Sequence, residues 1–147
     1  FFGRDQLITE DERFRLGGAG SVRGFANNTL GPLLDDTPTG GEFLLNYNAE
    51  LRYPLIEAAD LWGAVFFDAG LLADCFTRSG DTDVRTSCYR DAFGGDNPVE
   101  GIRTAAGIGI RYLIVEQIPL AFDYAMVLDR RPGEEFGNLH FNLGYSF

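Results

Sequence analysis

The sequence has no hydrophobic run approaching the ~20 residues that a membrane-spanning helix needs. Any passage through a bilayer must therefore use strands, in which apolar residues alternate with polar ones. Lys-rich and Glu-rich helical stretches are also missing, whereas 19 glycines, 13 phenylalanines and 6 tyrosines are many for 147 residues. This composition favours strands and turns over helices, and the length is that of one ordinary domain.

Clusters of positive charge are absent as well. The formal net charge is −10, and the 12 basic residues are spread along the chain without a basic run. Binding of phosphates requires clustered Lys and Arg, so the sequence argues against a nucleic-acid partner.

Residue sets for catalysis or metal binding are missing too. The single histidine, His140, has no Ser or Cys nucleophile and second base at a recognisable spacing, so we expect no catalytic residues and no enzyme. Acidic residues between Asp74 and Asp96 match no calcium-loop spacing, and no metal or cofactor is expected. Cys75 and Cys88 lie in a polar segment without further zinc ligands, which favours a loop disulfide over free thiols and implies an oxidising compartment.

What the chain does have is alternation with a period of two. It is clearest at the end, where Leu139, Phe141, Leu143, Tyr145 and Phe147 alternate with polar or small residues. A period of two places the large apolar side chains on one face of a strand. The same pattern predicts five strands, at residues 43–53, 61–71, 102–113, 118–128 and 139–147.

The faces and connections of these strands favour a membrane barrel. One face is apolar and aromatic, and the other carries Asn46, Asn48, Glu50, Arg52, Arg103, Arg111, Asp123 and His140. Short connections alternate with long ones, as in outer-membrane barrels. A soluble antiparallel sheet or ligand-binding barrel, with the apolar face as its core, is the alternative.

Five strands are too few to close a barrel, since the smallest single-chain outer-membrane barrels have about eight. The chain also opens on Phe1 and Phe2 without a secretion signal, so we expect a mature, processed or partial chain. Its expected partners are outer-membrane lipid and the remaining barrel strands, supplied by the same precursor or by a separate chain.

Residues 14–25, Phe-Arg-Leu-Gly-Gly-Ala-Gly-Ser-Val-Arg-Gly-Phe, resemble the signature of the sixth extracellular loop in the Omp85 superfamily. This superfamily includes BamA- and TamA-like assembly factors and two-partner secretion transporters. Residues 48–55 and 66–70 look like the family's next two strands. The resemblance implies an all-β, antiparallel transmembrane barrel of roughly 16 strands. Residues 1–41 would be the long loop folding into the lumen, and residues 42–147 the five C-terminal strands.

The resemblance also implies two sets of functional residues. The loop-anchoring motif is Ser21, Val22, Arg23, Gly24 and Phe25. In the family its arginine pairs with acidic residues on the two following strands, which match Glu50 and Asp68 here. Independently, the alternation places both acids on the polar face, and a guanidinium can hold two carboxylates. The last strand, Leu139 to Phe147, resembles the signal that the assembly machinery recognises by strand pairing.

The function that this resemblance implies is insertion or translocation of outer-membrane proteins, in the bacterial outer membrane, by a BamA/TamA-like barrel. The resemblance also implies two further kinds of partner: periplasmic or lipoprotein assembly partners, and client outer-membrane proteins. A two-partner-secretion-type transporter is the alternative within the family. A passive porin-like or structural barrel is a further alternative, which the signature at residues 14–25 disfavours.

Overall fold

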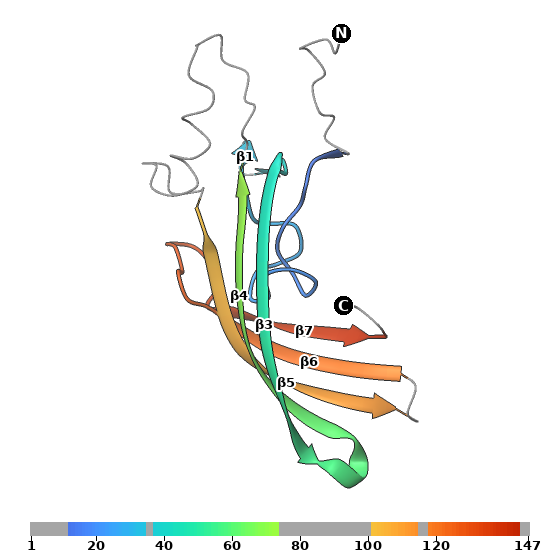
Figure 1. Cartoon of the computed structure of the whole chain (residues 1–147). Helices are drawn as coiled ribbons and strands as arrows, with labels where there is room; N and C mark the ends of the chain where they lie inside the picture. The colour runs from blue at the N-terminus through green and yellow to red at the C-terminus, as the bar shows by residue number, and fades with distance from the viewer. Residues whose placement is uncertain (1–11, 35–36, 74–100, 115–117, 145–147) are drawn as a thin grey trace, which may run out of the picture.

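A computed structural model describes residues 12–34, 37–73, 101–114 and 118–144. Most of the described chain forms one antiparallel sheet, in which each strand pairs with the next along the chain (Figure 1). Its strands are β3 (Phe43–Ile56), β4 (Leu61–Ala73), β5 (Arg103–Ile114), β6 (Ile118–Val127) and β7 (Gly137–Leu143). The 3-10 turn η2 (Glu57–Ala59) joins β3 to β4, and β1 (Leu33–Leu34) pairs with β2 (Thr37–Pro38). No described residue belongs to a helix long and apolar enough to span a membrane.

The five predicted strands and the antiparallel fold class are confirmed, with shifts of a few residues at the ends. Strand β7 begins two residues early, at Gly137, because Gly137 and Asn138 continue the ladder opposite Met126 and Ala125. Strand β3 also extends beyond its predicted end to Ile56, with a register irregularity between Pro54 and Ile56. Tyr145 and Phe147, together with Cys75 and Cys88, lie outside the described residues.

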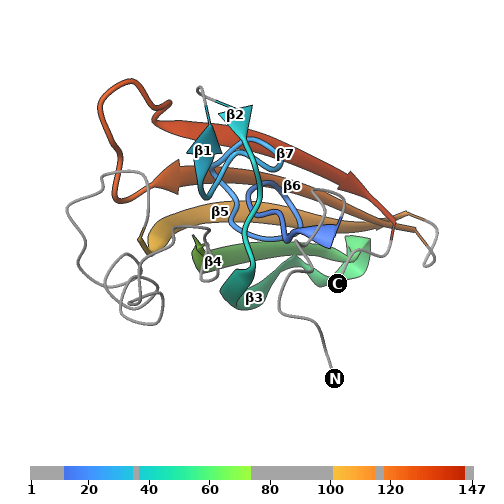
Figure 2. The same ribbon diagram turned by 90° about the horizontal axis from the view of Figure 1, so that it is seen from above.

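The sheet is twisted and curved, and residues 12–34 lie against its inner side (Figures 1 and 2). Leu16 and Val22 of this segment are almost fully buried. They belong to an apolar cluster made by the segment and the inner sheet face: Leu16, Val22, Phe25, Leu30, Leu72, Ala105 and Val127. Burial of one large apolar side chain contributes about 1.5–3 kcal/mol, so this packing is a main source of the segment's stability.

The opposite face of the sheet is apolar and uncovered. Ile108 is 63% exposed and Leu139 is 71% exposed, although both lie well inside their strands. Neighbouring strands add Leu45, Tyr47, Leu51, Val65, Phe67, Ile110, Phe122, Tyr124, Phe141 and Leu143. A contiguous patch of this kind is rare on a soluble monomer and matches the lipid-facing band of a barrel.

Candidate functional site: a buried arginine at the tip of the inner segment

The tip of the inner segment is a tight turn between Gly17 and Phe25. The backbone N–H of Gly18 donates to the carbonyl of Val22 at 3.2 Å, and the N–H of Gly17 donates to the Ser21 hydroxyl at 2.9 Å. Gly24 has a φ of +98°, and a Cβ there would lie 3.3 Å from the Ala105 Cβ. Only glycine adopts this backbone readily and fits so close to β5. The turn thereby presses Arg23 onto the sheet.

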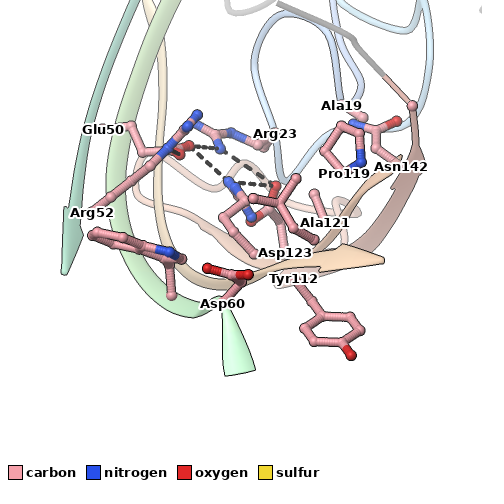
Figure 3. Close-up of a pocket in the computed structure, with 14 residues that line it drawn as sticks. Ala19, Arg23, Glu50, Arg52, Asp60, Tyr112, Pro119, Ala121, Asp123 and Asn142 are labelled. Atoms are coloured by element: carbon pink, nitrogen blue, oxygen red, sulfur yellow. Dashed lines mark hydrogen bonds and ion pairs between the residues drawn. The ribbon is translucent and has the colours of Figure 1, made fainter. Parts of the chain in front are cut away.

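Arg23 makes a dense set of hydrogen bonds with carboxylates on the inner face. Its Nε and Nη2 donate to the two carboxylate oxygens of Asp68 in β4, at 2.7 and 2.9 Å. Nη1 donates to Glu50 in β3 at 2.8 Å and, at 3.4 Å, to Asp123 in β6 (Figure 3). The side chains of Arg23, Asp68 and Asp123 are 8%, 0% and 4% exposed. Buried charges are tolerated only when paired in this way.

The ionisation of Arg23 follows from these contacts. Burial opposes the charged guanidinium, but the hydrogen bonds that it donates to Asp68 and Glu50 outweigh this effect and raise the pKa of Arg23 above its ordinary value. The arginine therefore stays charged at any physiological pH.

A second arginine completes the charge network. Arg111 of β5 donates to Asp123 through Nη1 and to Glu50 through Nη2 at 2.8 Å, so it shares both acids with Arg23. Arg52 adds a contact to Glu50 at 2.7 Å. The charge network therefore consists of three arginines and three carboxylates: Arg23, Arg52, Arg111, Glu50, Asp68 and Asp123. The network ties β3, β4, β5 and β6 to the inner segment.

An aromatic ring lies beside the arginine. The Cζ of Arg23 lies 3.5 Å from the ring centroid of Phe66, which is 5% exposed. Such a desolvated cation–π contact adds about 2 kcal/mol to an ion pair. Gly107 of β5 gives the ring its space, since a Cβ there would collide with Phe66. Gly107 therefore contributes indirectly to the binding of Arg23, by leaving space for the ring on which Arg23 stacks.

Polar side chains also hold the backbone of the turn. Asn48 in β3 donates to the carbonyl of Ser21 and to Asp68. On the other side, Asn138 in β7 donates to the Gly24 carbonyl at 3.0 Å, and the Gly24 N–H donates to Nε2 of His140 at 3.0 Å. The turn is therefore held by both edge strands of the described sheet, β3 and β7.

Beside the turn lies a cavity of about 450 Å³, whose lining includes Pro119, Asn142 and every member of the charge network except Asp68 (Figure 3). Within the described ranges, no group of three His, Cys, Asp or Glu residues is arranged to hold a metal ion. The arrangement is suited to holding a loop in place, because its donors and acceptors already satisfy one another.

The structure brings together Arg23, Glu50 and Asp68, the three residues grouped from the sequence. Ser21 closes the turn, and Val22 and Phe25 pack into the apolar cluster. Leu139, Phe141 and Leu143 lie exposed on the outer face of β7. From the sequence, four further residues of the site could be assigned only to the inner face: Phe66, Arg111, Asp123 and His140. Asn138 lies before the predicted start of the last strand and had no such signal.

A profile of the Omp85 superfamily domain matches residues 2–147 of this chain, which is almost all of it. The chain belongs to the Omp85 superfamily. Members of this superfamily with the same fold are bacterial outer-membrane proteins, and so is this chain. The outer membrane protein assembly factor BamA of Neisseria meningitidis serogroup B is 31% identical to it, over 99% of this chain and 20% of that protein.

A solved structure has the same fold. The crystal structure of BamA from Haemophilus ducreyi lacking POTRA domains 1-3 superposes with a TM-score of 0.63 and 25% identity. It matches 89% of this chain and 26% of the crystallised one. This Omp85 chain therefore spans about a fifth of the length of its curated relative and about a quarter of the solved one.

Proposed function

We propose that this chain is the C-terminal part of a BamA-like barrel that inserts other proteins into the outer membrane. The observation that carries the proposal is the buried Arg23 network, which fixes an inner segment to a sheet whose other face is uncovered and apolar. Similarity to BamA over 99% of the chain supports it. Residues 1–41 form the inner loop and residues 42–147 the last five strands of a barrel of roughly 16.

The proposed mechanism is strand exchange, without covalent chemistry. In such a barrel the last strand, β7 here, would meet a first strand that lies outside this sequence, and an opening between the two would present backbone N–H and C=O groups. Such an edge can template a client strand by main-chain hydrogen bonding. The inner segment, held to β3 and β7, keeps this part of the barrel in shape while the edge is open. No residue is required to act as a nucleophile or general base.

The partners follow from this role. Outer-membrane lipid covers the apolar face, the remaining strands come from the same precursor or a separate chain, and client outer-membrane proteins pair with the edge. Periplasmic or lipoprotein assembly partners would deliver the clients. The alternation at Leu139, Phe141, Leu143, Tyr145 and Phe147 would serve as this chain's own assembly signal. We also propose a disulfide between Cys75 and Cys88, which lie outside the described residues.

Depletion of the full protein in its native host tests the role. A BamA-like insertase predicts that many outer-membrane proteins decrease together, measured by quantitative proteomics of the membrane fraction. Loss of one exported protein alone would instead indicate a two-partner-secretion-type transporter. A change in small-solute permeability alone would indicate a porin-like barrel.

A second measurement addresses the missing strands. Purification from native outer membranes in mild detergent, followed by mass spectrometry, identifies what stays bound to this sequence. A separate polypeptide carrying the remaining strands would establish a split barrel. A single longer polypeptide would establish a continuous one.

A further inference from the structure

A second buried arginine lies outside the Arg23 network. Arg103, at the start of β5, is 5% exposed and faces the inner segment. Its guanidinium Cζ lies 4.7 Å from the ring centroid of Phe25, the last residue of the motif. Phe25 is itself 6% exposed. A cation over a desolvated aromatic face is an attractive and geometrically specific contact.

The donors of Arg103 are used by the connection between β6 and β7, residues 128–136. Nη1 and Nη2 donate to the two carboxylate oxygens of Glu134, at 2.9 and 2.6 Å. Nε donates to Asp129 at 2.6 Å. A guanidinium held by a bidentate carboxylate and a second acid has little rotational freedom, so its plane is fixed over Phe25.

The two acids are in turn held by backbone groups. Asp129 accepts from the N–H of Thr104 at 2.9 Å, and Glu134 accepts from the N–H of Arg131 at 2.9 Å. The conformation of the connection and the orientation of Arg103 therefore depend on each other. Any movement of the connection has to move the cation that covers Phe25.

The two arginines form a reciprocal pair of contacts. The arginine of the motif stacks on an aromatic ring of the sheet, Arg23 on Phe66, while the aromatic ring of the motif is covered by an arginine of the sheet, Arg103 on Phe25. The ion pairs of the first involve Glu50, Asp68 and Asp123, and those of the second involve Asp129 and Glu134. No carboxylate is shared between them.

We propose that Arg103 is a positioning residue that couples the β6–β7 connection to the loop motif through Phe25, as a second clamp independent of Arg23. A change in the β6–β7 connection would then alter how firmly the inner segment is held to the sheet. A change that releases Glu134 leaves Arg103 held by Asp129 alone, so its plane over Phe25 is no longer fixed and the turn loosens from one side. This coupling does not depend on which client the barrel handles.

Hydrogen–deuterium exchange on the full-length protein, folded in lipid vesicles, tests the coupling. Phe25→Leu keeps an apolar side chain but removes the ring face, and it should raise amide exchange in residues 128–136 by about tenfold. Phe25→Trp restores a ring face and should bring exchange in this connection back to within about threefold of wild type. In the other direction, Glu134→Gln should raise exchange in residues 21–25.

Arg130→Gln is the matched control, because Arg130 belongs to the same connection and is exposed. It should leave exchange in residues 21–25 unchanged. If Phe25→Leu loosens only its own segment, the ring merely fills space and the coupling is wrong. If Phe25→Leu does not fold, as judged by heat-modifiable gel mobility, Glu134→Gln decides, and unchanged exchange in residues 21–25 overturns the proposal. These experiments measure hydrogen exchange in this protein and not the insertion of client proteins. Their outcome is therefore independent of whether the proposed insertase function is correct.

Discussion

Replacement of Arg23 by Ala should release the inner segment from the sheet. The change deletes two hydrogen bonds to Asp68, one to Glu50 and a longer one to Asp123, and it removes the cation over Phe66. Asp68, which is fully buried, would keep only the donor of Asn48 and the N–H of residue 23. Breaking a buried pair by removing one partner costs about 3–5 kcal/mol. Because those two donors remain, we expect the lower end, about 3 kcal/mol.

A loss of about 3 kcal/mol increases the open population of the segment roughly 100-fold, since each 1.4 kcal/mol is a factor of ten. Limited proteolysis of the full protein in vesicles measures this opening, if the cleavage rate within residues 12–34 is followed by mass spectrometry. Arg15→Ala is the control, because Arg15 lies in the same segment and is exposed. Lys at position 23 keeps the charge without the planar fork, and should give an intermediate rate. Equal cleavage of wild type, Arg23→Ala and Arg15→Ala would refute the anchoring role.

Three further predictions concern other parts of the chain. Gly24→Ala should destabilise the turn by at least ~1 kcal/mol because of its positive φ and close contact with β5, whereas Gly20→Ala, with open space around it, should not; urea unfolding in vesicles compares them. Ile108→Arg should lower the free energy of unfolding by about 2–4 kcal/mol in the same assay if the exposed Ile108 side chain faces lipid. A change near zero would show that this side chain faces water. Hydrogen bonding from Arg103 lowers the pKa of Glu134 below its ordinary 4.5, so its stabilisation is complete above pH 4.5 and is lost as pH falls through the lowered pKa. In wild type, the protection of the β6–β7 connection against hydrogen exchange should therefore decrease as the pH falls below 4.5. Glu134→Gln should abolish this dependence of protection on pH.

The strands and their faces were predictable from the sequence because a period of two is a local property. Glu50 and Asp123 could each be assigned to the inner face from their immediate neighbours. What alternation does not provide is the register between strands. Sliding one strand by two residues keeps every face and changes every neighbour. The sequence therefore placed Arg111 and Asp123 on the correct face but not in the network with Glu50.

The acids grouped with Arg23 came mainly from the resemblance, whereas nothing in the sequence indicated that Phe66 and Phe25 would each stack on an arginine. Phe66 and Phe25 look like ordinary core residues in the sequence, and the ring of each is stacked by an arginine from a distant segment. Gly107 could be taken as a lumen-facing small residue, but the ring that needs its space is visible only once β4 and β5 are paired. Contacts between segments far apart in sequence account for most of what was missed.

The inner segment takes the place that a second layer takes in a soluble protein. The sheet turns its broad apolar face outward, so the apolar side chains that pack on its inner face come from residues 12–34 instead. The inner layer is thus supplied by the same chain as the sheet, so a change that detaches residues 12–34 would strip the inner face without removing any strand.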